Sequence, residues 1–265
     1  MFQPLYVAAT GLSALQDDIL SITNNLANAK TVAFKKGRTE MESLFYIEKS
    51  FQDQLYEAMS GSETPPVSVE YGTGVRVAST PRDFAQGSIE VTNNPLDIAV
   101  NGQGFFQFRM RDGSYAYGRA GNLHVDNDGN LVDPNGHMLV PDIVVPEGTT
   151  SVIIQQDGTI LVAVNNETEY SDIGQVSLAR FTNPAGLKSI GQNLFQATEA
   201  SGEPLIGTAG DEGFGMINQY SLEQSNVDVI SEMMRMVMVQ RVFDTVTKAV
   251  QSYEGMLTSL ERMKQ

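Results

Sequence analysis

The sequence predicts an α+β protein, in which helices at both ends of the chain form a coiled-coil core domain around an inserted β domain. Near each end, apolar residues recur at alternating steps of three and four, whereas the middle consists of short β-type runs separated by Asn-Gly and Asp-Gly pairs. Helices and strands differ in this periodicity. We therefore expect a discontinuous helical domain (1–30 with 221–265), an extended linker domain (31–74) and an antiparallel, sandwich- or barrel-like β domain (75–220).

A helix is expected over residues 5–29. Its apolar positions are Leu5, Ala8, Leu12, Leu15, Ile19, Ile22, Leu26 and Ala29. A repeat of 3.5 residues is typical of a coiled-coil seam. Gly11 lies within the repeat and costs about 1 kcal/mol relative to Ala, so this helix needs a partner. We expect the assembly interface on this helix to be Leu5, Leu12, Leu15, Ile19, Ile22 and Leu26.

The C-terminal region repeats the same spacing. Its apolar positions are Val239, Val242, Val246, Ala249, Tyr253, Met256, Leu260 and Met263, and we expect the second interface at Val239, Val242, Val246, Tyr253, Met256 and Leu260. Upstream, "VISEMMRMVMVQRVF" is apolar on more than one face, which favours several neighbours. Methionine suits interfaces that repack. The alternative is that the two helices pack only within one monomer.

Residues 31–74 show no sustained period, and "SGSETPPVSVEYGTG" is turn-rich and interrupted by proline, as in extended chain. From residue 75 to 220, strand-like runs alternate with hairpin signals. These signals are Asn101-Gly102, Asp112-Gly113, Asp128-Gly129, Asn135-Gly136 and Asp157-Gly158. We expect tight hairpins with positive φ at both central residues. Ser225, Asn226 or Asp228 is expected to cap the final helix.

The net charge of −15 argues against a nucleic-acid partner and against docking on anionic lipid, because both need clustered Lys and Arg. Residues 1–45 sum to zero and residues 221–265 to −1, so the middle carries −14. This asymmetry favours ends that pack together and a middle that faces water; the alternative is an acidic protein in which the asymmetry has no meaning.

Cysteine is absent, which excludes disulfides and thiolate chemistry. No apolar run approaches the ~18–20 residues of a membrane span. The N-terminus lacks the basic and apolar regions of a cleaved signal peptide, so export, if it occurs, is expected without signal cleavage.

Catalysis, cofactor binding and metal binding are not predicted. Gly102-x-Gly104 precedes a strand rather than a helix and is expected to be a turn before a strand that buries Phe105 or Phe106. "DNDGN" is expected to be a hairpin turn, since a helical calcium site needs a glutamate where His137 stands. His124 and His137 are expected to be exposed turn residues.

Several segments, in order, resemble the bacterial flagellar axial proteins of the rod and hook. They are "AATGLSALQDDILSITNNLANAKTVAFKK", "TNNPLDIAVNGQGFFQF", "YAYGRAGNLHVDNDGNLVDPNGHMLV", "LKSIGQNLF" and "SNVDVISEMMRMVMVQRVFDTVTKAVQSYEGML". "VEYGTGVRV" and the chain length resemble the members that form the distal rod. One position departs from the pattern, because the family commonly has Gly where Ala33 stands. A positive φ there would strain Ala33 by ~1 kcal/mol or more.

The resemblance implies a structural subunit that polymerises into a helical tube, a drive shaft that transmits torque from the motor to the hook. Implied partners are further copies of the chain, proximal rod proteins, the hook protein, ring proteins of the periplasm and outer membrane, and the type III export apparatus. The implied location is the basal body, in the periplasm and across the outer-membrane ring region. Alternatives are a proximal rod or hook-type subunit, or a β-sandwich binding module on a helical stalk.

The stretch "NNLANAKTVAFKK" is interpreted as the exit from the inner coiled coil. We expect a hinge formed by Asn24, Asn25, Asn28, Ala33 and Phe34, in which asparagine side chains bond the backbone as helical order ends. Lys35, Lys36 and Arg38 are interpreted as partners of nearby acidic residues rather than as a nucleic-acid site.

Overall fold

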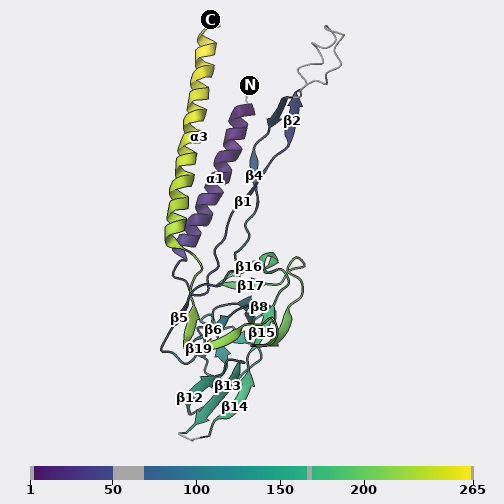
Figure 1. The fold of residues 1–265 in the computed structure, drawn as a ribbon, viewed down its shortest axis with the longest axis vertical. Helices are drawn as coiled ribbons and strands as arrows, with labels where there is room; N and C mark the ends of the chain where they lie inside the picture. Colours follow the sequence, from purple (N-terminus) through teal and green to yellow (C-terminus); the bar gives the residue numbers. More distant parts are fainter. Residues whose placement is uncertain (1–2, 50–68, 166–168, 264–265) are drawn as a thin grey trace. The chain divides into compact units, whose positions relative to one another are not determined.

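The computed structural model describes residues 3–49, 69–165 and 169–263 (Figure 1). The chain divides into two compact units. The helical unit comprises Met1–Asn24, Gly37–Pro81 and Ile230–Gln265, and the β unit comprises Asn25–Lys36 and Arg82–Val229. The helices are few and the strands pair antiparallel, as expected for an α+β protein.

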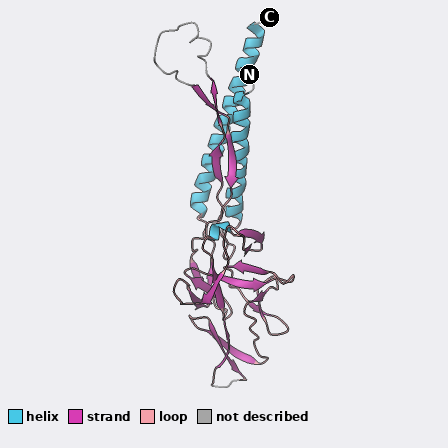
Figure 2. Ribbon diagram, turned by 90° about the vertical axis from the view of Figure 1, so that its right-hand side faces the viewer, coloured by secondary structure: helices cyan, strands magenta, loops and turns pink. Residues whose placement is uncertain are grey.

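Two long helices dominate the helical unit. These are α1 (Gln3–Ala27) and α3 (Val229–Met263), which lie side by side in both ribbon views (Figures 1 and 2). The Arg235 guanidinium (Nη2) lies 2.7 Å from Asp18 Oδ1 and joins them. On α1, Ala14, Asp18 and Ile22 recur every fourth residue and are buried, as a helical period requires. The helix ends at Ala27, two residues before the last predicted apolar position.

A long hairpin arm also belongs to the helical unit (Figure 2). Its strands are β1 (Glu40–Ser43), β2 (Tyr46–Lys49), β3 (Val69–Gly72) and β4 (Val75–Ser79), with β1 paired to β4 and β2 to β3. Two backbone bonds, Leu44 N to Gly74 O at 2.8 Å and Thr73 N to Phe45 O at 3.1 Å, join the two pairs into one ladder. An extended linker was expected over residues 31–74. Residues 50–68 of that segment, with most of "SGSETPPVSVEYGTG", lie outside the described residues.

The arm approaches α1 closely at Gly74. A Cβ at Gly74 would lie 2.2 Å from Thr10 Oγ1, and Gly74 has a φ of +124°. Thr10 Oγ1 also accepts a hydrogen bond from Val75 N at 3.4 Å. Glycine at position 74 is therefore required both by its backbone conformation and by the helix beside it.

In the described residues of the β unit there are sixteen short strands and one 3-10 turn. They are β5 (Ile89–Val91), β6 (Ile98–Asn101), β7 (Phe105–Arg109), β8 (Tyr115–Gly118), β9 (His124–Val125), β10 (Leu131–Val132), β11 (Met138–Leu139), β12 (Thr149–Ile154), β13 (Thr159–Val164), β14 (Ser171–Gln175), β15 (Ser177–Arg180), η1 (Pro184–Gly186), β16 (Lys188–Gly191), β17 (Leu194–Gln196), β18 (Leu205–Thr208), β19 (Met216–Gln219) and β20 (Ser221–Glu223).

The main sheet has nine strands and is organised around β7. One edge of β7 pairs with β8, while its other edge pairs first with β15 and then with β11. The smaller sheets are β12-β13-β14, β19-β6 and β20-β5. A strand with partners on both edges has no backbone group left for water, which explains why β7 lies at the centre of the unit.

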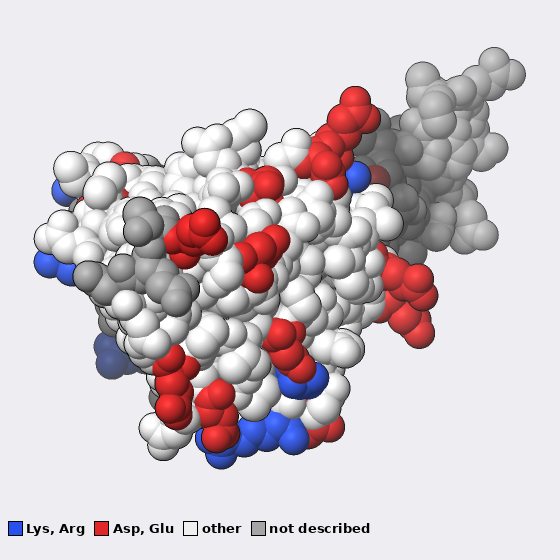
Figure 3. Space-filling view, turned by 90° about the horizontal axis from the view of Figure 1, so that it is seen from below, with Lys and Arg blue, Asp and Glu red and all other residues white. Residues whose placement is uncertain are grey.

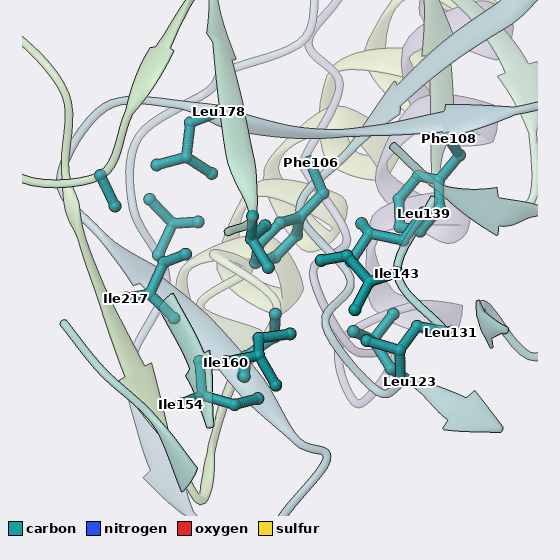
Figure 4. Close-up of a cluster of buried hydrophobic side chains, with 14 of the residues drawn as sticks. Phe106, Phe108, Leu123, Leu131, Leu139, Ile143, Ile154, Ile160, Leu178 and Ile217 are labelled. Carbon is teal, nitrogen blue, oxygen red and sulfur yellow. The ribbon is translucent and has the colours of Figure 1, made fainter. Parts of the chain in front are cut away.

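Both faces of β7 are buried in apolar cores. Phe106 and Phe108 enter the larger core with Leu123, Leu131, Leu139, Ile143, Ile154, Ile160, Leu178 and Ile217 (Figure 4). Phe105 enters a second core with Tyr117, Ala179, Phe181, Leu187 and Phe195. There, ring pairs meet edge to face, with centroids 5.8 Å apart for Phe105–Phe181 and 4.9 Å for Tyr117–Phe181. Phe105 or Phe106 was expected to be buried, and both side chains are buried.

Four of the predicted hairpin turns share one geometry, which differs from the expected one. Only the glycine has positive φ, at 83° for Gly113, 85° for Gly129, 80° for Gly136 and 87° for Gly158. Each glycine N–H also bonds back to the carbonyl three residues earlier, as Gly113 does to Met110 at 3.0 Å. These are type I turns followed by a bulge glycine. The expectation of positive φ at both central residues was wrong for these four. It was also wrong for Asn101-Gly102, where only Gly102 has positive φ, at 116°, and where β6 pairs with β19 rather than forming a hairpin with β7.

The aspartates explain why this turn type is favoured. In the 110–114 turn, Asp112 Oδ1 accepts bonds from the Ser114 N–H at 2.9 Å and the Ser114 hydroxyl at 2.6 Å. Asp126 Oδ1 likewise accepts from Asp128 N and Asn130 N at 2.9 and 2.8 Å, so "DNDGN" is a hairpin turn as predicted. Hydrogen bonds lower the pKa of Asp126. The largest contribution comes from the Asn130 side chain, and backbone N–H groups of the turn add to it.

One histidine differs from its expectation. His124 is exposed, but His137 is buried. His137 Nε2 lies 3.1 Å from Gln192 Oε1, and its backbone N–H donates to Asp133 Oδ1 at 2.8 Å. Gln192 is distant from His137 in sequence, and a local turn signal does not reveal such a tertiary contact.

The face drawn in Figure 3 carries acidic groups dispersed among uncharged ones, with fewer basic groups between them. This fits the excess of Asp and Glu in the middle of the sequence. In the described part of the chain, neither helix is both long and apolar enough to cross a membrane.

The two-sided burial of β7 is testable at adjacent residues. The Phe105 ring is 3% exposed and the Phe106 ring is 0% exposed. Phe105→Ala and Phe106→Ala each remove one of these buried rings, so each is expected to lower the free energy of unfolding by about 3–5 kcal/mol. Val91→Ala, at an 83% exposed strand position, is the control and should change it by less than about 0.5 kcal/mol. Urea unfolding of the full chain, followed by circular dichroism, measures all three. A neutral Phe105→Ala would contradict a second core.

Candidate functional site

The candidate site is a set of surfaces and a buried cluster rather than a catalytic pocket. Within the described ranges, no group of three or more His, Asp or Glu residues is placed to hold a metal ion. The described residues offer two features, apolar helix faces that stay accessible and buried charges that pair.

The predicted N-terminal interface lies on α1. Ile22 is buried, while Leu5, Leu12, Leu15, Ile19 and Leu26 are half-buried. Each of these five side chains keeps part of its surface accessible within one copy of the chain. Two further apolar residues of α1, Tyr6 and Leu20, are 61% and 66% exposed and were not in the predicted interface.

The predicted C-terminal interface divides between two faces of α3. Val239 is buried and Val246 and Tyr253 are half-buried, whereas Val242 and Met256 are exposed. Leu260 lies in α3, but its side chain is outside the described residues. The side chains covered within the chain form a stripe with steps of three and four, namely Met236, Val239, Phe243, Val246, Val250, Tyr253 and Leu257.

The first half of α3 carries an exposed apolar surface that we call the methionine face. It consists of Ile230, Met233, Met234, Val237, Met238 and Val242, all exposed. Four of its side chains and Arg241 line a shallow hollow. Because this helix is apolar on a covered side and on an uncovered side, the sequence pattern "VISEMMRMVMVQRVF" was a correct signal for more than one apolar face.

A buried charge cluster lies in the β unit and was not predicted. The carboxylate of Glu223, at the end of β20, is fully buried. Its Oε1 lies 2.5 Å from Lys35 Nζ and accepts the Gly87 N–H at 2.8 Å, and its Oε2 lies 3.4 Å from Arg119 Nη1. Both cations are themselves buried. A buried carboxylate needs such partners, because an unpaired one would cost several kcal/mol.

Each of the two cations also donates a hydrogen bond to a backbone carbonyl. Lys35 Nζ donates to Ala85 O at 2.8 Å, and Arg119 Nη2 donates to Gly102 O at 2.8 Å. The Arg119 guanidinium also lies 5.4 Å from the centre of the Phe105 ring, a cation–π contact. Burial lowers the pKa of Lys35 and of Arg119, and the attraction of Glu223 opposes that shift in both.

The backbone around the cluster joins three segments that are distant in sequence. Ala33 N donates to Glu223 O at 2.8 Å, and Asn226 N donates to Phe34 O at 3.3 Å. The Asn226 side chain accepts from Lys36 N at 2.8 Å and donates to Asp83 O at 2.8 Å. We call these segments, 33–36, 82–87 and 223–226, the three-segment clamp.

Ala33 has a positive φ, the conformation that the sequence analysis considered for it because the family commonly has Gly there. Its φ is +57°, and its side chain is buried. This left-handed conformation costs a residue with a Cβ roughly 1–2 kcal/mol. The clamp holds it through the Ala33–Glu223 backbone bond, and Phe34 beside it is buried with the Arg82 guanidinium 5.3 Å from its ring centre.

The other predicted hinge residues lie at a boundary between units. Asn24 ends one segment of the helical unit, and Asn25 begins a segment of the β unit. Asn28 Oδ1 accepts the Thr31 hydroxyl at 3.1 Å after α1 has ended. Three residues were considered as caps of α3. Ser225 accepts a hydrogen bond from Val227 N at 3.3 Å, and Asn226 belongs to the clamp. Asp228 is the residue directly before the helix, which begins at Val229.

The basic residues after the exit pair with acids, as predicted. Lys35 contacts Glu223, Lys36 Nζ lies 3.6 Å from Asp83 Oδ2, and Arg38 Nη2 lies 2.6 Å from Glu40 Oε1. The Lys35 and Lys36 pairs belong to the three-segment clamp, and the Arg38 pair is local.

Two parts of the chain match known sequence families. Residues 99–162 match the family described as flagellar hook protein FlgE/F/G D1 domain, and residues 218–263 match flagellar basal body rod FlgEFG protein C-terminal. A flagellar basal-body rod protein FlgG from Borreliella burgdorferi is 36% identical over 273 residues, covering 100% of this chain and 99% of the relative. The chain belongs to the flagellar basal-body rod protein family.

Other relatives match over the same extent. FlgG of Buchnera aphidicola from Acyrthosiphon pisum is 38% identical over 266 residues, with 99% of this chain and 100% of the relative covered. FlgG of Caulobacter vibrioides is 34% identical over 262 residues, with 99% of each covered. The flagellar basal-body rod family is structural, and this chain is accordingly a structural protein rather than an enzyme.

The importance of the buried carboxylate is testable by an isosteric change. Glu223→Gln keeps the shape but leaves Lys35 and Arg119 without their shared counter-charge, so it is expected to lower the free energy of unfolding by about 3–5 kcal/mol. Asp142→Asn is the matched control, because it breaks the exposed Arg109–Asp142 pair at 2.6 Å and should cost at most about 1 kcal/mol. Urea unfolding measures both, and equal costs would show that the cluster is not a special constraint.

Proposed function

We propose that the chain is a subunit of the flagellar distal rod, which polymerises into a helical tube and transmits torque from the motor to the hook. The observation that supports this most is its similarity to FlgG proteins along its whole length. The uncovered apolar helix faces are what a subunit that binds further copies of itself would present.

Assembly through the helices accounts for their unusual surfaces. In our proposal, the predicted N-terminal and C-terminal interfaces, together with the methionine face, pack against other copies and form a coiled-coil core domain of the tube. Each large apolar side chain buried in this way contributes about 1.5–3 kcal/mol before ordering costs. An interface between different faces of successive copies generates a helical filament when the rotation between copies does not close into a ring.

The remaining parts take roles consistent with the proposed tube. We assign α1 and α3 to its helical core, the hairpin arm β1–β4 to a linking domain, and the β unit to an outer β domain. Asn24, Asn25 and Asn28 form the exit from the core, and Ala33 and Phe34 anchor that exit in the three-segment clamp. A drive shaft must carry load across such connections, and buried ion pairs with backbone bonds resist displacement more than exposed contacts do.

The proposed partners are proximal rod proteins, the hook protein and the ring proteins of the periplasm and outer membrane, with delivery by the type III export apparatus. The proposed location is the basal body, in the periplasm and across the outer-membrane ring region. The dispersed acidic surface in Figure 3 suits a β domain that turns past a neighbour without binding it tightly.

Charge placed on an uncovered helix face tests the assembly proposal. Val242→Asp changes a side chain that is 44% exposed in one copy, so the monomer should keep its helical circular dichroism while polymers and motility are lost. Gln240→Glu, an exposed change on the same helix, is the control and should assemble.

Two further variants probe the half-buried interface positions. Ile19→Asp and Val246→Asp are expected to block assembly as Val242→Asp does, because each would bury an unpaired carboxylate. Tubes seen by electron microscopy with all three variants would contradict assembly through these helices.

A further inference from the structure

The methionines of this chain are concentrated on one helix. The chain has 12 methionines, and Met233, Met234, Met236 and Met238 lie within six consecutive residues of α3. Three of these four thioethers belong to the methionine face, with exposed fractions of 51% at Met233, 61% at Met234 and 65% at Met238. Met236, on the covered stripe, is half-buried.

Exposed thioethers undergo a defined reaction with peroxides. The sulfur lone pair attacks one peroxide oxygen, the O–O bond breaks, and methionine sulfoxide and water are formed with hydrogen peroxide. The sulfur is oxidised by two electrons and the peroxide is reduced. The product is polar and chiral where the reactant was apolar and flexible.

We propose that Met233, Met234 and Met238 are oxidation sites, at which a peroxide converts the methionine face of a free subunit into a surface that cannot assemble. This rests on the proposed function, since the consequence requires that the face is covered by another copy. The hollow lined by these three residues, Val237 and Arg241 places the oxidised sulfurs together in one patch.

The other described methionines provide internal comparisons. Met110 is half-buried, and Met138 is half-buried with its sulfur 3.4 Å from Arg109 Nη2. These two are shielded and should oxidise more slowly than the methionine face. Met216, on β19 in the β unit, is 51% exposed and should oxidise without any effect on assembly.

The size of the effect follows from burial of a polar group. A sulfoxide oxygen buried without a hydrogen-bond partner weakens association, and we expect about a tenfold rise in the subunit concentration needed for assembly for each oxidised residue. Oxidation at three sites would therefore abolish polymers at ordinary concentrations. The change is reversible, because sulfoxide reductases restore both epimers of the thioether.

The test treats the full-length subunit with hydrogen peroxide, removes the peroxide with catalase, and follows polymer formation by sedimentation and electron microscopy. Peptide mass spectrometry reads the sulfoxide at each methionine. The variant with Met233→Leu, Met234→Leu and Met238→Leu keeps an apolar face of similar volume without an oxidisable sulfur. Every subunit in the test, including the one treated as wild type, also carries Met256→Leu, because Met256 is 57% exposed and lies in the predicted C-terminal interface. Met216→Leu is the matched control, and Met234→Gln introduces a polar group without any oxidant.

We expect the three face methionines to oxidise several-fold faster than Met110 and Met138, and treated wild-type subunits to lose assembly. The triple Leu variant should assemble after treatment, Met216→Leu should behave as wild type, and Met234→Gln should assemble poorly without treatment. Normal polymers from subunits carrying the three sulfoxides would overturn the inference alone, as would equal peroxide sensitivity of the triple Leu variant. Failure of untreated wild-type subunits to polymerise would instead count against the proposed function, and with it this inference.

Discussion

The buried carboxylate of Glu223 is the constraint on which the β unit and its three-segment clamp depend. A carboxylate removed from water is tolerated only when its oxygens are satisfied, and its partners here are Lys35, Arg119 and the Gly87 N–H. These partners come from segments up to 188 residues apart in sequence. Satisfying one side chain therefore fixes the positions of the segment that leaves α1, the segment before β5 and the segment that leads into α3.

Periodic features of the fold were predictable from sequence, because they arise from local geometry. The repeat that includes Leu12, Ile19 and Val246 identified both long helices, and the Asp-Gly pairs identified hairpins. The turn type was mispredicted because Asp112 and its counterparts bond the backbone two residues on, which stabilises a type I turn with a bulge glycine. Local sequence therefore specified the turn, but through a hydrogen bond that the dipeptide rule does not include.

Tertiary features were not predictable in the same way. Nothing in "SLEQ" distinguishes a buried Glu223 from an exposed strand residue, because its burial depends on Lys35 and Arg119 being brought to it. His137 was expected to be exposed for the same reason. The positive φ of Ala33, by contrast, was raised as a question by the resemblance to the flagellar axial proteins, whose pattern commonly has glycine at that position; composition and periodicity gave no sign of it.

The division of each unit into distant stretches of sequence has a consequence for the order of synthesis. A ribosome makes the α1 segment long before residues 230–263, so the helical unit lacks its second helix for most of translation. Contacts of such long sequence separation form late and slowly. The β unit is similarly incomplete until Glu223 emerges, so the nascent chain spends most of its synthesis without either finished unit. Neither unit can therefore complete its fold until the last segments of the chain have been made.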